Sequence, residues 1–244
     1  MRKAIVIGMA AAAAAAASAG CARERHQSVG PTVERNYQVG GFERIEVAGG
    51  YDVEVHTGTA PSVHAKGPEK DLERLVIEVK GDRLLIHPRE SRGLFHVGWR
   101  NHGKTMISVT VPQLRSADVA GSGDIRIDNV HGDNFAGKIA GSGGLSLDNV
   151  EVKTLDFSIA GSGSAQGKKG RAQNVSLNIA GSGDIDTKGV ASETASVSIA
   201  GSGNVVAHAS GTASVSMMGS GDVDLTGGAK CSISKHGSGD VRCS

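Results

Sequence analysis

The stretch Ser198–Val206, SIAGSGNVV, decides the fold, because its Ala-Gly-Ser-Gly core occurs five times at one fixed spacing. Two altered copies, MGSG and HGSG, follow it. The first glycines of the seven copies are Gly121, Gly141, Gly161, Gly181, Gly201, Gly219 and Gly237. The steps between them are therefore 20 residues, and 18 for the last two. A fixed period near 20 is typical of a solenoid, in which each repeat adds one coil to a stack.

Apolar and polar residues alternate around every copy, which indicates β-strands with one buried face. The position two residues before the first glycine holds Val119, Ile139, Ile159, Ile179, Ile199, Met217 and Lys235. By this alternation both glycines point inward, where a tight bend leaves no room for a Cβ atom, and the serine between them points outward. We therefore expect an all-β parallel solenoid over residues 116–244, with about 20-residue coils.

Residues 39–115 are strand-rich but irregular, and we expect them to form one continuous domain with residues 116–244. The segment Ile45–Val55, IEVAGGYDVEV, fits the same pattern as a further coil, with Tyr51 at the second glycine position. The segment Pro68–Leu75 has the composition of a short capping helix. A hairpin is expected around Lys80-Gly81-Asp82.

The first 20 residues are typical of an export signal, and residues 21–38 of a polar tether. Arg2 and Lys3 precede the apolar stretch Ala4–Ala17, which is shorter than the ~20 residues of a membrane span. Two processing routes stay open: an A-x-A site at Ala17-Ser18-Ala19, or a lipobox ending at Cys21, which would carry the lipid. Both place the protein in the periplasm or at the outer membrane and cell surface, with membrane contact only through the lipid at Cys21.

If Cys21 is lipidated, two cysteines remain, Cys231 and Cys243. Both have inward parity, six residues either side of Gly237, and an exported protein meets an oxidising compartment. We expect a disulfide between them; the alternative is two buried free thiols.

Composition and spacing argue against several functions. The net charge of +1 gives no reason to expect a nucleic-acid partner. The outward serine column has no accompanying histidine column, and a nucleophilic serine needs a base. No cofactor is implied, and His96 and His102 lack the spacing of a metal site. Asp222 and Asp240, neighbours in the next outward column, are explained by solvent screening or, alternatively, by a bound cation.

The segment 87–104 is the strongest candidate for binding. It interleaves basic and aromatic residues, a combination that suits anionic polysaccharide or lipid head groups. The candidate ligand-binding residues are Arg89, Arg92, Phe95, Trp99, Arg100 and Lys104. The alternative is an exposed hairpin whose Phe95 and Trp99 pack on the solenoid.

Three segments in this order, FERIEVAGGYDVEVHTG, RLLIHP and ISVTVPQLRSADVAGSGDI, followed by the repeats, resemble the head GIN domain of bacterial auto-transporter adhesins. The resemblance covers about residues 40–244 and implies a right-handed parallel β-helix on an exported protein, often a lipoprotein. We therefore expect a non-catalytic binding or structural module of the cell envelope, with an envelope component as partner and self-association through solenoid ends or faces as a further option. The alternative is a polysaccharide-acting enzyme, which a cleft lined by converging Asp and Arg would favour.

Overall fold

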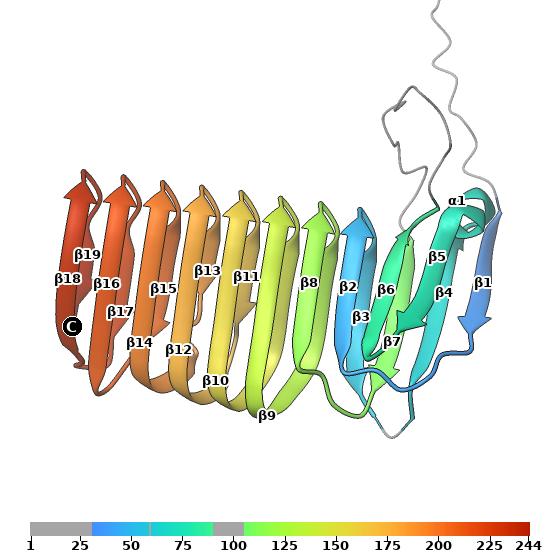
Figure 1. The fold of residues 1–244 in the computed structure, drawn as a ribbon, viewed down its shortest axis with the longest axis horizontal. Coiled ribbons are helices and arrows are strands. Elements are labelled where there is room, and N and C mark those ends of the chain that lie inside the picture. The colour runs from blue at the N-terminus through green and yellow to red at the C-terminus, as the bar shows by residue number, and fades with distance from the viewer. Residues whose placement is uncertain (1–30, 59, 90–104) are drawn as a thin grey trace, which may run out of the picture.

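The computed structural model describes residues 31–58, 60–89 and 105–244. They form an all-β solenoid of about six turns with coils of roughly 20 residues, as the repeat predicts. Figure 1 shows the coils stacked side by side, with one wall of strands in front and a second wall behind. The strands of the regular part are β8 (Ser116–Gly121), β9 (Asp124–Gly141), β10 (Gly144–Gly161), β11 (Ser164–Gly167), β12 (Gly170–Gly181), β13 (Asp184–Asp186), β14 (Val190–Gly201), β15 (Asn204–His208), β16 (Thr212–Gly219), β17 (Val223–Thr226), β18 (Lys230–Gly237) and β19 (Val241–Cys243).

Neighbouring coils pair in parallel and are displaced by one repeat. Ile139 lies beside Ile159, Ile159 beside Ile179, and Ile179 beside Ile199. All four are at most 3% exposed, so the predicted apolar file runs through the interior. Aliphatic side chains stacked in this way supply most of the core, which explains why a chain with 3% aromatic residues can fold.

The bends use glycine for a reason different from the one the alternation suggested. The second glycine of each bend is buried as expected, but the first is partly buried, or exposed at Gly237, and has a φ between +131° and +144°. A Cβ atom on Gly181 would strike the carbonyl oxygen of Gly161 in the coil before it. The close approach of successive coils, more than a narrow interior, therefore excludes a side chain at this position.

The irregular N-terminal part adds parallel strands to both walls and then covers the N-terminal end of the solenoid with antiparallel strands and a helix. Its elements are β1 (Thr32–Tyr37), β2 (Arg44–Gly49), β3 (Asp52–Thr57), β4 (Ser62–Pro68), α1 (Glu69–Arg74), β5 (Leu75–Lys80), β6 (Arg83–Pro88) and β7 (Met106–Val111). β2 pairs in parallel with β8 and places Gly49 beside Gly121, so Ile45–Val55 is the predicted further coil. The predicted helix is α1, and the predicted hairpin is the antiparallel pair β5 and β6.

One expected boundary is wrong. The polar composition predicts a tether over residues 21–38, but residues 32–37 form β1, which pairs antiparallel with β4. Val33 and Tyr37 alternate with polar residues and pack against the core. The domain therefore begins before residue 39.

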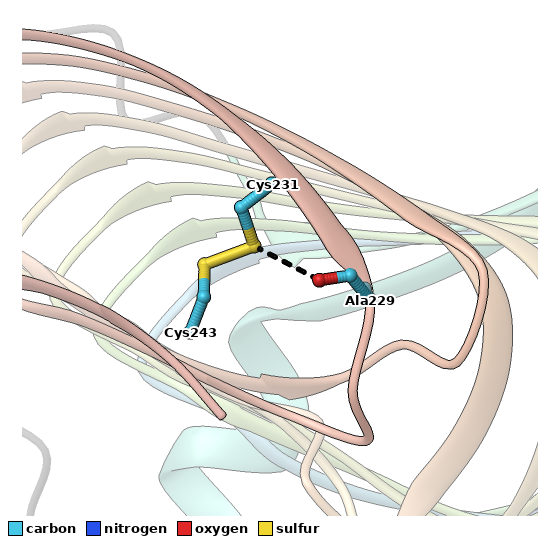
Figure 2. Close-up of a disulfide and its surroundings, with 3 residues drawn as sticks. All are labelled: Ala229, Cys231 and Cys243. Atoms are coloured by element: carbon cyan, nitrogen blue, oxygen red, sulfur yellow. Dashed lines mark hydrogen bonds between the residues drawn. A yellow bond between two sulfur atoms is a disulfide. The ribbon is translucent and has the colours of Figure 1, made fainter.

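The C-terminal coil is closed by a disulfide between Cys231 of β18 and Cys243 of β19, with 6.6 Å between the two Cα atoms. Figure 2 shows the bond crossing between the two strands. In register, Cys231 lies beside buried Ala213 and Cys243 beside buried Leu225, so both cysteines continue interior columns. None of the helices within the described ranges has the length and apolar character needed to cross a membrane.

Candidate functional site

The outward serine column is part of the bends between successive coils. The seven serines of this column are exposed. Their backbone N–H groups donate to the first-glycine carbonyl one coil back, for example Ser142 to Gly121 at 2.8 Å and Ser182 to Gly161 at 2.8 Å. The column therefore marks where backbone hydrogen bonds hold successive bends together.

The next outward column forms a ladder of side-chain to backbone hydrogen bonds. Asp184 Oδ1 accepts from the backbone N–H of Asn204 at 3.2 Å and from its Nδ2 at 2.8 Å. Asn204 Oδ1 accepts from the N–H of Asp222, and Asp222 Oδ1 from the N–H of Asp240 at 2.8 Å. This ladder explains neighbouring Asp222 and Asp240 without a bound cation. In the described residues no cluster of three or more His, Cys, Asp or Glu could hold a metal.

We call the wall that contains β2, β8, β16 and β18 the front wall (Figure 1). A cleft of about 500 Å³ opens on it, near its N-terminal end. Its lining residues come from β2, β6, β8, β9 and β10 and from the segment that leads into β8. They are Arg44, Arg83, Gln113, Arg115, Ser116, Asp118, Asp133, Asn134, Phe135, Ala136, Lys138, Thr154 and Asp156. Arginines and aspartates thus converge on one hollow of the surface.

The arginines of this cleft are each held by one carboxylate. Arg44 Nε lies 3.2 Å from Asp82, and Arg115 Nε lies 2.9 Å from Glu43. Arg83 Nη1 lies 2.7 Å from Glu46 Oε2. The side chains of Arg44 and Arg115 are 47% and 60% exposed, so a ligand can reach both guanidinium groups, each of which carries five N–H donors.

Asp118 is the unusual acid of the cleft. Its Oδ1 is shielded from solvent and has no hydrogen-bond partner among the described residues. Burial raises the pKa of this carboxyl above its ordinary value, against the opposing effect of nearby Lys138 and Arg83. A shielded carboxylate oxygen without a hydrogen bond costs stability, and acidic groups with a perturbed pKa gather at functional sites.

Of the six predicted ligand-binding residues, the structure describes only Arg89. It is exposed directly after β6, and its backbone N–H donates to Arg74 O at 2.7 Å. The other five residues, Arg92, Phe95, Trp99, Arg100 and Lys104, lie outside the described residues, as do His96, His102 and Cys21.

Alternation alone does not predict the cleft, although the repeat contains a clue to it. Three residues before the first glycine, the regular coils carry small polar residues such as Ser158, Asn178 and Ser198. The first coils carry Glu46, Asp118 and Lys138 at the same position. Extending this column to the N-terminal coil would have revealed a change from small to charged side chains.

The fold and this surface define an all-β solenoid with a capped N-terminal end and a polar outer wall. A family model described as "Putative auto-transporter adhesin, head GIN domain" matches residues 41–229. The chain belongs to this family, as the resemblance in its sequence indicated.

Solved structures share the fold. A "putative adhesin" from Bacteroides fragilis has a TM-score of 0.79 at 22% identity, over 88% of this chain and 97% of that one. A "Putative lipid binding protein" from Parabacteroides distasonis has a TM-score of 0.71 at 24% identity, over the same shares. A "putative adhesin" from Parabacteroides merdae has a TM-score of 0.68 at 17% identity, again over 88% and 97%. No curated protein matches the sequence.

Proposed function

We propose that the protein is an exported, non-catalytic binding module of the cell envelope, whose rigid solenoid presents the basic and aromatic segment 87–104 to an anionic partner. Membership of an adhesin family supports an envelope location. The partner is an anionic polysaccharide or a lipid head group, and one structural neighbour is described as a lipid-binding protein.

One observation carries this proposal: the place of the segment in the coil. β6 pairs in parallel with β2, and β7 pairs in parallel with β3. β6 and β7 therefore belong to one coil, and residues 89–105 stand in the sequence where other coils have their Gly-Ser-Gly bend. The segment is therefore longer than the three-residue bends of the regular coils.

The experiment measures binding of the mature chain to vesicles of phosphatidylglycerol, to vesicles of phosphatidylcholine and to polygalacturonate. We expect the anionic probes to bind, with an affinity that falls as salt rises. The double variant Trp99→Ala, Arg100→Ala should bind about tenfold more weakly. Arg171→Ala, which removes an exposed cation elsewhere on the solenoid, should bind normally. Absence of binding by the parent chain, or equal binding by the double variant, would refute the proposal.

The proposed anchor is a lipid on Cys21, with signal cleavage after residue 20. A lipidated chain partitions into detergent, and Cys21→Ser releases it to the aqueous phase. A mature chain that begins after Ala19 without added mass would instead indicate the ordinary signal peptidase.

A polysaccharide-acting enzyme is the second candidate, because the cleft on the front wall does bring Asp and Arg together. Glu46 and Asp118 are register partners on adjacent strands, so their Cα atoms are about 4.8 Å apart. Glycoside hydrolysis uses a pair of carboxyl groups, and these two are the nearest pair of acidic residues on this wall by register. Release of reducing ends from envelope polysaccharides by the parent chain, and its loss in Glu46→Gln and Asp118→Asn, would favour this candidate.

A further inference from the structure

The cleft on the front wall forms where two small residues, Ser116 and Ala136, lie between larger charged residues. Five residues before the first glycine, the outward column runs Arg44, Ser116, Ala136 and Asp156 in register. Ser116 and Ala136 form the floor, and Arg44 and Asp156 rise on either side of it. Further along the solenoid the same column holds only small residues, Ser176, Ser196 and Ser214, so the wall is flat there.

Two further sides of the hollow are also charged. The adjacent column places Asp118 and Lys138 beside the floor, and Arg115 lies where the chain enters β8. Asp118 Oδ1 lacks a hydrogen bond to any described residue, and Lys138 lies close enough to lower the pKa of this carboxyl. Charged donors and acceptors therefore line one space.

The lining carries charges of both signs. It holds four cations, Arg44, Arg83, Arg115 and Lys138, and three carboxylates, Asp118, Asp133 and Asp156, and each arginine also contacts a carboxylate outside the lining. A ligand with net charge of either sign would meet repulsion as well as attraction. A hydroxyl group both donates and accepts a hydrogen bond, so a chain of hydroxyls matches alternating carboxylates and cations.

We propose that this cleft binds an uncharged saccharide. Its hydroxyls donate to Asp118 and Asp156 and accept from Arg44, Arg115 and Lys138. A volume of about 500 Å³ lies within the usual range of small-molecule sites. Phe135 of the lining is 1% exposed and offers no ring for stacking, so hydrogen bonds carry the recognition. This site is distinct from segment 87–104 and does not depend on the function proposed above.

The test is calorimetric titration of the full mature chain with chitohexaose, maltohexaose, cellohexaose and, as the charged probe, hexagalacturonate. At least one neutral probe should bind, with an affinity that is unchanged when the salt concentration is raised, because the ligand carries no charge. Ser116→Phe fills the floor and should weaken this binding at least about tenfold. Ser196→Phe adds the same ring to the same column on the flat part of the wall and should leave binding unchanged.

Asp156→Ala, a surface change at the rim, repeats the test if Ser116→Phe does not fold, and should also weaken binding. The proposal is overturned if none of the neutral probes binds at millimolar concentration, or if the cleft variants bind as well as the parent. Binding of hexagalacturonate alone, falling steeply with salt, would overturn the uncharged class. The Trp99→Ala, Arg100→Ala variant should retain neutral-sugar binding, which separates failure here from failure of the proposed function.

Discussion

At each bend, the first glycine combines two constraints that no other residue satisfies. Gly181 has a φ of +132°, a region that residues with a Cβ rarely occupy. Its missing Cβ also leaves space for the Gly161 carbonyl, which accepts the hydrogen bond from Ser182. The glycine and the serine after it therefore serve the same contact between coils.

We predict that Gly181→Ala destabilises the protein by at least about 2 kcal/mol, because strain at positive φ adds to the contact with Gly161. Denaturant unfolding followed by circular dichroism measures this. Ser182→Ala is the matched control, since it keeps the backbone donor and changes only an exposed hydroxyl. Equal effects of the two substitutions would contradict this account of the bend.

Asp118 leads to a prediction that depends on pH. Burial raises the pKa of its carboxyl in the folded protein above the ordinary value of 3.8. The folded protein therefore favours the protonated carboxyl. The stability associated with this group is fully present below pH 3.8, and it is lost as the pH rises through the folded-state pKa and the buried carboxyl becomes charged. We expect Asp118→Asn to raise the melting temperature at pH 7 and to lose this advantage near pH 3.

Thermal scans at the two pH values test this expectation, and sugar titrations on the same variant add a second measurement. If Asp118 is kept for binding, the variant should gain stability while it loses affinity for the neutral probe. A variant that is less stable at pH 7 than at pH 3, relative to the parent, would show that Asp118 is stabilised as a carboxylate.

Between elements, the ladder that includes Asp184, Asn204 and Asp222 joins strands on the rear wall. Each side-chain oxygen accepts the backbone N–H of the following coil. We predict that Asp184→Ala costs about 0.5–1.5 kcal/mol for each of the two hydrogen bonds that its Oδ1 accepts from Asn204, and that Asp184→Asn largely restores stability. Denaturant midpoints provide the comparison.

The last member of the ladder is the natural control. Asp240 donates its N–H to Asp222, but no described coil follows it, and its carboxylate accepts no bond there. Asp240→Ala should therefore leave the midpoint unchanged. A comparable loss in Asp184→Ala and Asp240→Ala would mean that the carboxylates act through charge and not through the ladder.

Much of this element-level order could be predicted from the sequence. The period of Gly121, Gly141 and Gly161 defines the stacking, and alternation assigns the inner and outer faces. The strand β1 is not predictable in this way, because residues 32–37 lie outside the repeat and pair antiparallel with β4. The cleft is not predictable either, because a hollow depends on neighbours across coils: Ser116 and Ala136 lie lower than their surroundings only when Arg44 and Asp156 are placed beside them.

For the molecule as a whole, the two ends of the solenoid are closed differently. At the N-terminal end, α1 and the antiparallel strands β1 and β5 cover the stack. At the C-terminal end, the apolar file stops at Lys235, whose Nζ donates to the Gly239 carbonyl at 2.6 Å. Ile233 is 48% exposed on this last coil. A lysine on an edge strand opposes pairing with further strands. The last described coil is therefore protected against strand addition by charge, whereas the N-terminal end is covered by secondary structure.

The disulfide at this end gives the last prediction. In the chain-entropy model, a bond closing the loop between Cys231 and Cys243 stabilises by roughly 3 kcal/mol. Because each coil of a solenoid contacts only its neighbours, removing the disulfide should destabilise only the last coil.

In the double variant Cys231→Ser, Cys243→Ser, we expect the backbone amides of β18 and β19 to exchange hydrogen faster, while those of β10 and β12 keep their protection. The parent chain treated with reductant should behave like the double variant. Uniform loss of protection along the stack would show that the coils unfold as one unit, and unchanged exchange in β18 would show that packing on β16 alone holds the last coil.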